Sequence, residues 1–220
     1  SHYPFDNDKR YYSSFDAGEY KDTFLGDYFE AIHYADEAVG YFIDELDKEG
    51  LLDRSIVAIY GDHFAVPRDK KEELAEYLKI KDMDEYNWVK HLRVPMLIHF
   101  PGGSHKGVNH TAGGGVDFMP TILNIMGVES SDMPMLGRDL LNTGDGLAVL
   151  RNGNFIINDY ICLTSGGKAF NCNTGEAYPV EKLEAEREYS KRLLEYSDKI
   201  IENNLVGELI EYLRKYGKAS

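Results

Sequence analysis

Residues 24 to 46 carry apolar side chains at the spacing of one face of an α-helix, so a long amphipathic helix is expected there. Gly50 follows at a position where a glycine commonly ends a helix. Residues 55 to 60 then form a continuous run of the type found in buried strands. A long helix followed by a buried strand predicts an α/β fold, because each element needs another to cover its apolar side.

The signals change near residue 148, from long helices and apolar strands to short strands and turns. We therefore expect an α/β core over residues 1–147 and a small antiparallel sheet with C-terminal helices over residues 148–220. The individual elements expected are a charged helix over 68–85, a strand over 94–100, a short helix over 117–127, short antiparallel strands over 148–176 and helices over 181–216.

The charge balance argues against some classes of partner. The 220 residues include 24 Lys and Arg and 38 Asp and Glu, for a formal net charge of −14. Such a surface repels phosphate backbones, so nucleic acid is not an expected partner. The sequence contains no run of eighteen apolar residues, so it predicts no membrane span. The chain is expected to be soluble as given. It starts at Ser1 without an initiator Met, which indicates a piece of a longer protein.

The two cysteines, Cys162 and Cys172, flank a turn-like sequence. A hairpin with a two-residue turn at Gly166 and Gly167 places Cys162 opposite Asn171, whereas a three-residue turn places it opposite Cys172 and allows a disulfide. Two unbonded thiols are favoured over a disulfide. A zinc site is disfavoured because two cysteines alone do not form one.

The strongest local signal is Gly61-Asp62-His63, directly after the first expected strand. Open α/β sheets gather their ligands at the carboxyl ends of strands. Adjacent side chains of a strand point to opposite faces, so Asp62 and His63 can converge only where the strand turns into a loop. A carboxylate and an imidazole together suit a divalent metal such as Mn²⁺ or Zn²⁺ better than Ca²⁺. Taken alone, the Asp-His pair favours a capping Asp beside a surface His over a metal site.

Other polar residues have plainer structural explanations. His33 and Asp36 lie one turn apart on the long helix, where a structural hydrogen bond is favoured over catalysis. His99 alternates with apolar neighbours in the second strand and is expected to pack there. Asp117 is expected to cap the short helix. His110 could reach a phosphate from its loop, but it belongs to no motif.

Three segments occur in a fixed order: Gly-Asp-His after an apolar strand, then Val-Pro-Met-Leu-Ile-His-Phe-Pro-Gly, then Val-Asp-Phe-Met-Pro-Thr-Ile-Leu-Asn-Ile-Met-Gly. Together they resemble the sulfatase and alkaline-phosphatase superfamily. The opening His2-Tyr3-Pro4-Phe5 and the segments at 151–156 and 196–205 further resemble the extracellular catalytic domain of lipoteichoic acid synthases, the phosphoglycerol transferases of Gram-positive bacteria.

The resemblance implies the C-terminal portion of a sulfatase-like α/β fold, with a mixed sheet flanked by helices. It also implies a metal with four protein ligands, two of which map onto Asp62 and His63, and a substrate-contacting histidine that maps onto His2. The family's nucleophilic Thr and its Glu ligand would lie upstream of this chain. No catalytic residue is therefore assigned within it, and the chain alone is expected to be inactive.

The function implied is transfer of glycerol phosphate, through a Thr-linked intermediate, onto a growing lipoteichoic acid polymer. The expected cofactor is a divalent metal, most simply Mn²⁺. The expected partners are a glycerophosphate lipid donor, the polymer acceptor and the missing N-terminal part of the same domain. The resemblance places the parent protein on the extracellular face of the membrane, with anchoring only through the absent N-terminal region.

Two other functions stay open on the sequence. A sulfatase or phosphodiesterase of the same superfamily would use Asp62 and His63 in the same way, with water as the final acceptor. A noncatalytic domain could keep the fold and bind a cell-wall polymer. The upstream sequence distinguishes the noncatalytic domain from the transferase and the hydrolase, because both enzymes need the Thr and the Glu.

Overall fold

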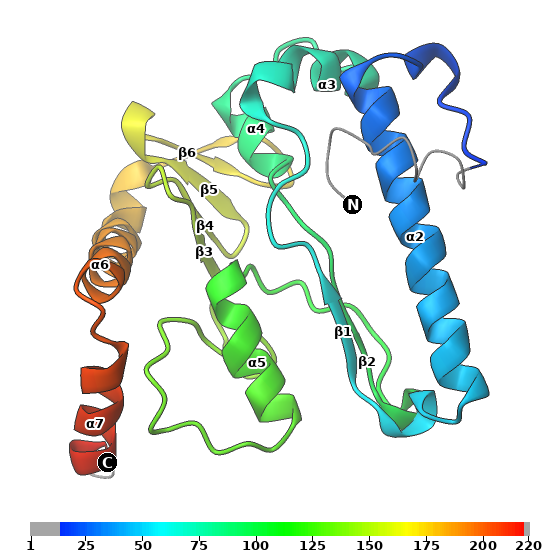
Figure 1. Ribbon diagram of the computed structural model, residues 1–220. Helices are drawn as coiled ribbons and strands as arrows, with labels where there is room; N and C mark the ends of the chain where they lie inside the picture. The colour runs from blue at the N-terminus through cyan, green and yellow to red at the C-terminus, as the bar shows by residue number, and fades with distance from the viewer. Residues whose placement is uncertain (1–13, 218–220) are drawn as a thin grey trace. The chain divides into compact units, whose positions relative to one another are not determined.

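A computed structural model describes residues 14–217 of the chain (Figure 1). His2 therefore lies outside the described residues. The chain divides into two compact units, Ser1–Gly107 and Val108–Ser220, which we describe separately. Helices and strands are both present, which confirms the α/β class. Among the described helices, none has the length and apolar character needed to cross a lipid bilayer.

The described part of unit 1, residues 14–107, contains a long helix, two short helices and a two-stranded sheet. Their bounds are α2 Phe24–Lys48, β1 Val57–Tyr60, α3 Lys71–Leu78, α4 Glu85–Lys90 and β2 Met96–His99. Single 3₁₀ turns occur at Gly18–Tyr20, Leu52–Arg54, Arg68–Lys70 and Pro101–Gly103.

The predicted long helix is confirmed as α2, and its two ends show why it forms. At the start, the Thr23 hydroxyl accepts a hydrogen bond from the Gly26 N–H at 3.1 Å, which satisfies one of the unpaired donors of the first turn. At the other end, Gly50 has a positive φ of 63°, and the N–H of Leu51 donates to the Leu46 carbonyl at 2.8 Å. This is the glycine-terminated helix end that the sequence predicted.

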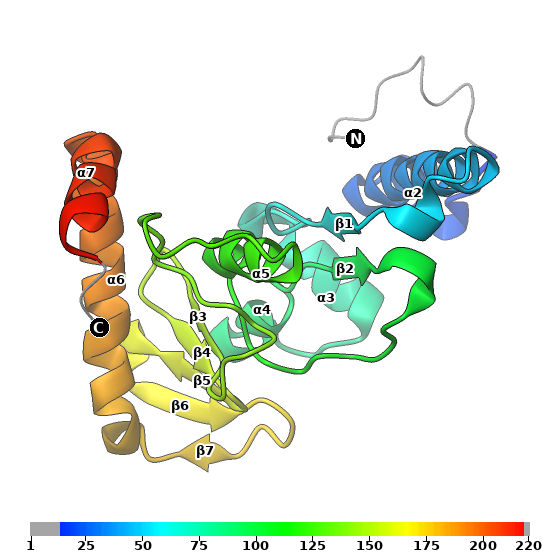
Figure 2. The same ribbon diagram turned by 90° about the horizontal axis from the view of Figure 1, so that it is seen from below.

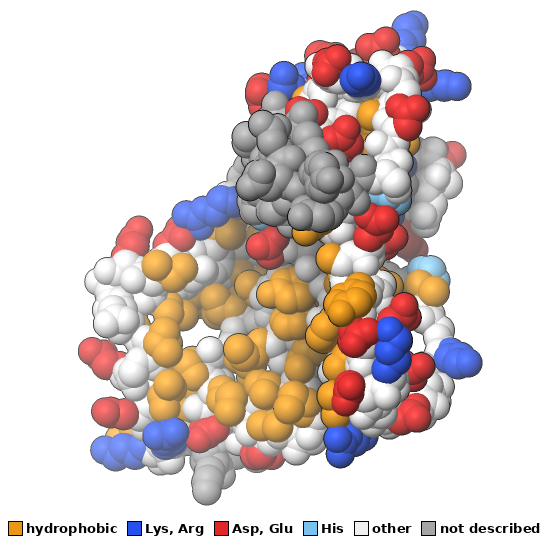
Figure 3. Space-filling view, turned by 45° about the vertical axis from the view of Figure 1, so that its right-hand side comes forward, with side chains coloured by type: hydrophobic (Ala, Val, Ile, Leu, Met, Phe, Trp, Pro, Cys, Tyr) orange, Lys and Arg blue, Asp and Glu red, His pale blue; other side chains and the backbone are white. Residues whose placement is uncertain are grey.

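The apolar face of α2 is buried at its start and exposed further along. Phe24 and Leu25 are 7% and 1% exposed and pack with Val66. Ile32 and Phe42, by contrast, are 47% and 52% exposed. Figure 3, which draws one face of the molecule, shows hydrophobic side chains (orange) open to solvent. Part of the apolar face of α2 is thus open to solvent.

Strands β1 and β2 pair antiparallel, with Val57 opposite His99 and Tyr60 opposite Met96. Both strands were predicted from sequence, and each is shorter than its predicted run. The five-stranded sheet of unit 2 is antiparallel as well, so the described residues contribute no parallel pair to the mixed sheet expected from the resemblance.

The charged stretch over 68–85 was predicted to be helical, but only α3, Lys71–Leu78, is an α-helix within it, and α4 begins at its last residue, Glu85. Helix α3 ends at Leu78, and Lys79 adopts the left-handed conformation with a φ of 56°. The next helix, α4, starts after Asp84, whose side chain accepts a hydrogen bond from the Asn87 N–H at 2.9 Å. A helical composition could not show this break, because Lys79 is an ordinary helix former.

Over residues 108–217, unit 2 contains three helices and a meander of five antiparallel strands in sequence order. Their bounds are α5 Phe118–Ile125, β3 Leu147–Val149, β4 Phe155–Ile157, β5 Tyr160–Leu163, β6 Lys168–Asn171, β7 Ala177–Tyr178, α6 Glu184–Glu202 and α7 Val206–Tyr216. Single 3₁₀ turns occur at Gly115–Asp117, Thr164–Gly166 and Val180–Leu183. The small antiparallel sheet with C-terminal helices is confirmed.

Helix α6 lies against this sheet and closes its core (Figure 2). Phe155 and Cys162 are fully buried in that core, and Leu193 of α6 packs against it. Helix α6 ends at Glu202. Asn204, between α6 and α7, has a positive φ of 51°. The sheet and α6 therefore form one hydrophobic layer pair.

Both predicted registers of the cysteine hairpin are wrong. Leu163 pairs with Lys168, which leaves a four-residue connection, and Cys162 pairs with Ala169. Cys172 lies beyond the paired residues, where its N–H donates to the Asp159 carbonyl at 2.7 Å. The favoured reading of two unbonded thiols is confirmed.

Candidate metal site

The Gly61-Asp62-His63 motif directly follows β1, as the sequence predicted. The Gly61 N–H donates to the Pro95 carbonyl at 2.9 Å. A Cβ on Gly61 would lie 2.9 Å from the Cβ of Val94, so no side chain fits without displacing a neighbour. The chain therefore turns tightly against the segment that leads into β2, and it leaves the strand geometry before Asp62.

The structure brings Asp62 and His63 together. Nε2 of His63 lies 3.7 Å from Oδ1 of Asp62, and the two side chains are 55% and 78% exposed. Nδ1 of His63 lies 2.8 Å from the backbone carbonyl of Phe64. Because a carbonyl only accepts, this contact places a proton on Nδ1. In the neutral ring the lone pair is then on Nε2, the nitrogen that faces Asp62.

This pair has the donor set and the spacing of two ligands to one divalent metal. Bonds from Zn²⁺ to imidazole nitrogen and to carboxylate oxygen are each about 2.0–2.2 Å long. One ion of that size can thus contact two atoms that are 3.7 Å apart. The described residues contain no group of three or more His, Cys, Asp or Glu that could hold a metal, so they offer only two of the four ligands that the resemblance implies. Their metal-binding role stays a prediction.

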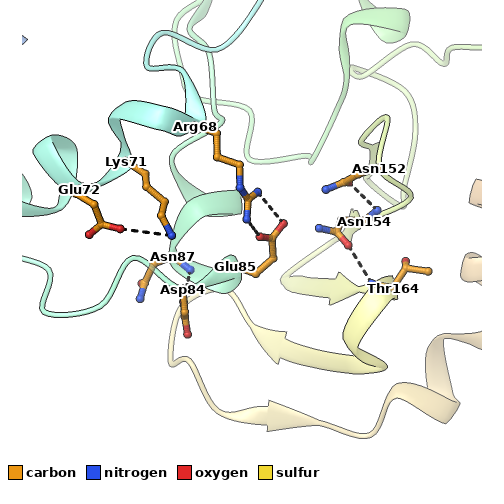
Figure 4. Close-up of polar contacts among 9 residues, drawn as sticks. All are labelled: Arg68, Lys71, Glu72, Asp84, Glu85, Asn87, Asn152, Asn154 and Thr164. Carbon is orange, nitrogen blue, oxygen red and sulfur yellow. Dashed lines mark hydrogen bonds and ion pairs between the residues drawn. The ribbon is translucent and has the colours of Figure 1, made fainter. Parts of the chain in front are cut away.

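The loop that follows the pair is anchored by an aromatic contact that the sequence did not predict. The ring of Phe64 packs edge-on against the ring of Trp88, with centroids 6.4 Å apart. The guanidinium of Arg68 lies over the same Trp88 ring, 5.6 Å from its centroid. Figure 4 shows the ion pair that this guanidinium forms with Glu85. The hydrogen bond to Glu85 raises the pKa of Arg68, so this positive charge is permanent. No local pattern marks these residues, because up to 24 positions of sequence separate them.

Two of the weaker histidine candidates have structural contacts. Nε2 of His99 lies 3.1 Å from the Leu52 carbonyl, which confirms that it is packed in its strand. Nε2 of His33 lies 3.7 Å from Glu37 rather than pairing with Asp36, the partner expected from sequence. Glu37 lies four residues after His33 and Asp36 three residues after it, and both spacings bring side chains together on a helix surface.

Asp117 is buried, at 2% exposed, and holds a loop rather than capping α5 with its side chain. Its two carboxylate oxygens accept hydrogen bonds from the N–H groups of Gly114 and Arg138, at 2.8 and 2.7 Å. His110 lies exposed in the loop before it. Neither residue belongs to the Asp62–His63 pair.

Comparison with known proteins supplies the family context. A family model described as Sulfatase matches residues 1–128. Lipoteichoic acid synthase 2 of Bacillus subtilis (strain 168) is 34% identical over 208 residues, which are 94% of this chain and 31% of that protein. Lipoteichoic acid synthase of Staphylococcus aureus (strain USA300) is 30% identical over 215 residues, which are 97% of this chain and 32% of that protein. The chain thus spans about a third of the length of the curated relatives it matches.

A solved structure supports the same relationship. The crystal structure of the lipoteichoic acid synthase LtaP from Listeria monocytogenes matches with a TM-score of 0.77 and 31% sequence identity. The match covers 92% of this chain and 52% of that one. At this identity and score the fold of this chain is that of the matched part of LtaP.

Proposed function

This chain belongs to the sulfatase family, and we propose that it is the C-terminal part of the extracellular catalytic domain of a metal-dependent phosphoglycerol transferase. The parent protein would polymerise glycerol phosphate for lipoteichoic acid. Similarity to lipoteichoic acid synthases over more than nine-tenths of the chain supports the assignment. The observation that carries it is the convergence of Asp62 Oδ1 and His63 Nε2 at 3.7 Å, at the end of a strand.

Asp62 and His63 would hold a divalent metal, most simply Mn²⁺, together with ligands from outside the described residues. When bound, the metal would acidify a hydroxyl nucleophile and polarise a phosphoryl oxygen. The chain's own contribution is to present one carboxylate oxygen and one imidazole lone pair on the same side of a tight turn. The Phe64 carbonyl assists by holding the proton on the other ring nitrogen of His63.

The nucleophile of the proposed reaction is a Thr upstream of Ser1, and the covalent intermediate forms on it. We assign substrate contact to His2, whose imidazole can donate a hydrogen bond to a phosphate or glycerol oxygen. The donor would be a glycerophosphate lipid and the acceptor the growing polymer, on the extracellular side of a Gram-positive membrane. Since the net charge of the chain is −14, attraction of a phosphate has to come from the local metal charge.

A further partner in this proposal is the N-terminal part of the same domain. The chain matches 52% of the LtaP chain, which leaves a comparable length of that fold without a counterpart here. In unit 1, Ile32 and Phe42 of α2 are exposed apolar residues, and the two-stranded sheet has short strands. A two-stranded sheet is marginally stable alone. The missing part would cover this apolar face and extend this sheet.

Calorimetric titration with Mn²⁺ tests the metal site. The titrations use this 220-residue chain and a version extended upstream through the rest of the domain, each as wild type, as Asp62→Ala and as Asp44→Ala. Asp44 is an exposed carboxylate on α2 and serves as the matched control. The extended wild type and Asp44→Ala are expected to bind one ion, and Asp62→Ala to lose it. Binding that is independent of Asp62 would overturn the proposal.

The reaction type needs a separate assay with a glycerophosphate lipid. The extended protein is expected to transfer the glycerophosphate group to a polymer hydroxyl. Release of free glycerophosphate without polymer growth would instead identify a hydrolase of the same family. If the upstream sequence carries neither a Thr nor a Glu in the family context and no turnover occurs, the domain is noncatalytic.

A further inference from the structure

The loop that carries the two candidate ligands is attached to unit 1 on both sides of them. Before the pair, the Gly61 N–H donates to the Pro95 carbonyl at 2.9 Å. After the pair, the Phe64 ring packs edge-on against Trp88, with an angle of 74° between the ring planes. Asp62 and His63 lie between these two attachments.

Trp88 is itself fixed, so it can serve as a support. It is 4% exposed and packs with Ala75 and Met83 in a core of unit 1. The Arg68 guanidinium lies 5.6 Å above its ring, and Glu85, on the same helix as Trp88, holds that guanidinium in an ion pair (Figure 4). A cation over a tryptophan face adds attraction to the packing.

Phe64 connects this support to His63. Its ring contacts Trp88, and its carbonyl lies 2.8 Å from Nδ1 of His63. Fixing the ring restricts the backbone of the same residue, and so it restricts the direction of the carbonyl. A histidine that ligates a metal usually donates its other ring N–H to such an oxygen, which sets both the ring orientation and the tautomer.

Building on the metal role proposed above for Asp62 and His63, we propose that Phe64 and Trp88 are positioning residues for this pair. Neither residue contacts metal or substrate. Trp88 holds the Phe64 ring, the Phe64 carbonyl holds the proton of His63 on Nδ1, and the Nε2 lone pair then faces Asp62. Loss of the Phe64 ring would move the first attachment after the ligands to Val66, which packs with Phe24 and Leu25, and so it would lengthen the unsupported segment that carries them.

The test compares Phe64→Ala, which removes the ring, with Phe64→Tyr, which keeps it. Phe64 is 45% exposed, so neither change empties a buried core. Tyr189→Ala is the matched control, because Tyr189 is an aromatic residue of similar exposure, 42%, in unit 2. The variants are made in the 220-residue chain and in the extended protein. Mn²⁺ affinity is measured by calorimetry, and the His63 tautomer is measured from ring ¹⁵N chemical shifts in the metal-free protein.

Phe64→Ala is expected to weaken Mn²⁺ binding about tenfold or more, as is typical when an outer partner of a ligand is lost. It should also shift His63 away from the Nδ1–H tautomer. Phe64→Tyr and Tyr189→Ala should match the wild type in both measurements. An unchanged tautomer in Phe64→Ala overturns the inference, whatever the affinity. If even the extended wild type shows no Asp62-dependent Mn²⁺ binding, the proposed function fails, and the tautomer of the metal-free protein alone decides the inference.

Discussion

Gly61 approaches Val94 so closely that a Cβ on Gly61 would lie 2.9 Å from the Cβ of Val94. The hydrogen bond from the Gly61 N–H to the Pro95 carbonyl holds the two segments at this separation. Two Cβ atoms cannot approach this closely, so an alanine at this position requires a shift of the backbone or of Val94. The close approach of Val94 therefore explains why position 61 is a glycine. A larger residue would displace the backbone directly before Asp62.

Substitution Gly61→Ala should lower the free energy of unfolding by about 1–3 kcal/mol, the usual cost of overpacking. It should also weaken Mn²⁺ binding in the extended protein, because the ligands follow the displaced residue. Urea denaturation and calorimetry measure the two effects. Gly40→Ala is the control, since Gly40 lies inside α2 with nothing within 4 Å of an added Cβ. That change should stabilise the protein by about 0.5–1 kcal/mol. Equal effects of the two substitutions would contradict the packing explanation.

The sequence predicted those features that depend on local spacing. The apolar period of residues 24 to 46 gave the extent of α2 to within two residues, because helix formation follows a repeat that is visible along the chain. The closeness of Asp62 and His63 was also predictable, since adjacent residues meet wherever a strand bends into a loop.

Features that depend on packing between distant residues were not predictable. The cysteine hairpin has a four-residue connection, and neither register inferred from the glycines is formed. The support of the Asp62–His63 loop by Trp88 joins residues 24 positions apart. The hairpin register and the Phe64–Trp88 contact both depend on how residues distant in sequence pack together, and a local sequence pattern does not contain that information.

Replacement of Asp117 should destabilise unit 2 strongly. The carboxylate is 2% exposed and accepts hydrogen bonds from Gly114 and Arg138. Asp117→Ala leaves two N–H donors without their acceptor, at a cost of about 2–4 kcal/mol. Asp132→Ala removes a carboxylate that forms a 3.4 Å surface ion pair with Arg214, so it should cost less than about 1 kcal/mol. Chemical denaturation of both variants measures the difference, and similar losses would refute the structural role of Asp117.

His91 should make stability depend on pH. Burial, followed by the neighbouring charge of Lys90, lowers the pKa of His91 below its ordinary value of about 6.5. As the pH falls, His91 therefore takes up its proton at a higher pH in the unfolded chain than in the folded chain. This contribution to stability is complete above pH ~6.5 and is lost as the pH falls through the folded pKa. The free energy of unfolding should fall over that interval in the wild type and fall less in His91→Gln. Identical profiles for the two proteins would show that His91 is not the group responsible.

The two cysteines should differ in reactivity. Cys162 is fully buried, and burial raises the pKa of its thiol, whereas Cys172 is partly exposed. Because the thiolate is the reactive form, a maleimide should label Cys172 in the native chain at least about tenfold faster than Cys162. Cys172→Ser should then label only after unfolding, and Cys162→Ser should label in the native state. Rapid labelling of native Cys172→Ser would contradict the buried position of Cys162.

The exposed apolar face of α2 predicts opposite effects of one substitution in two versions of the protein. Phe42, 52% exposed, lies about a quarter turn around the helix from Ile32. In the 220-residue chain, Phe42→Ser should reduce self-association in sedimentation experiments, because it removes exposed apolar area. In the extended protein the same change should lower the free energy of unfolding by about 3 kcal/mol, because the face is then buried. Tyr41 is the control, since it lies about two and a half turns from Ile32, on the opposite side. Tyr41→Ser should change neither property, and an equal effect of both substitutions would show that the α2 face is not a docking surface.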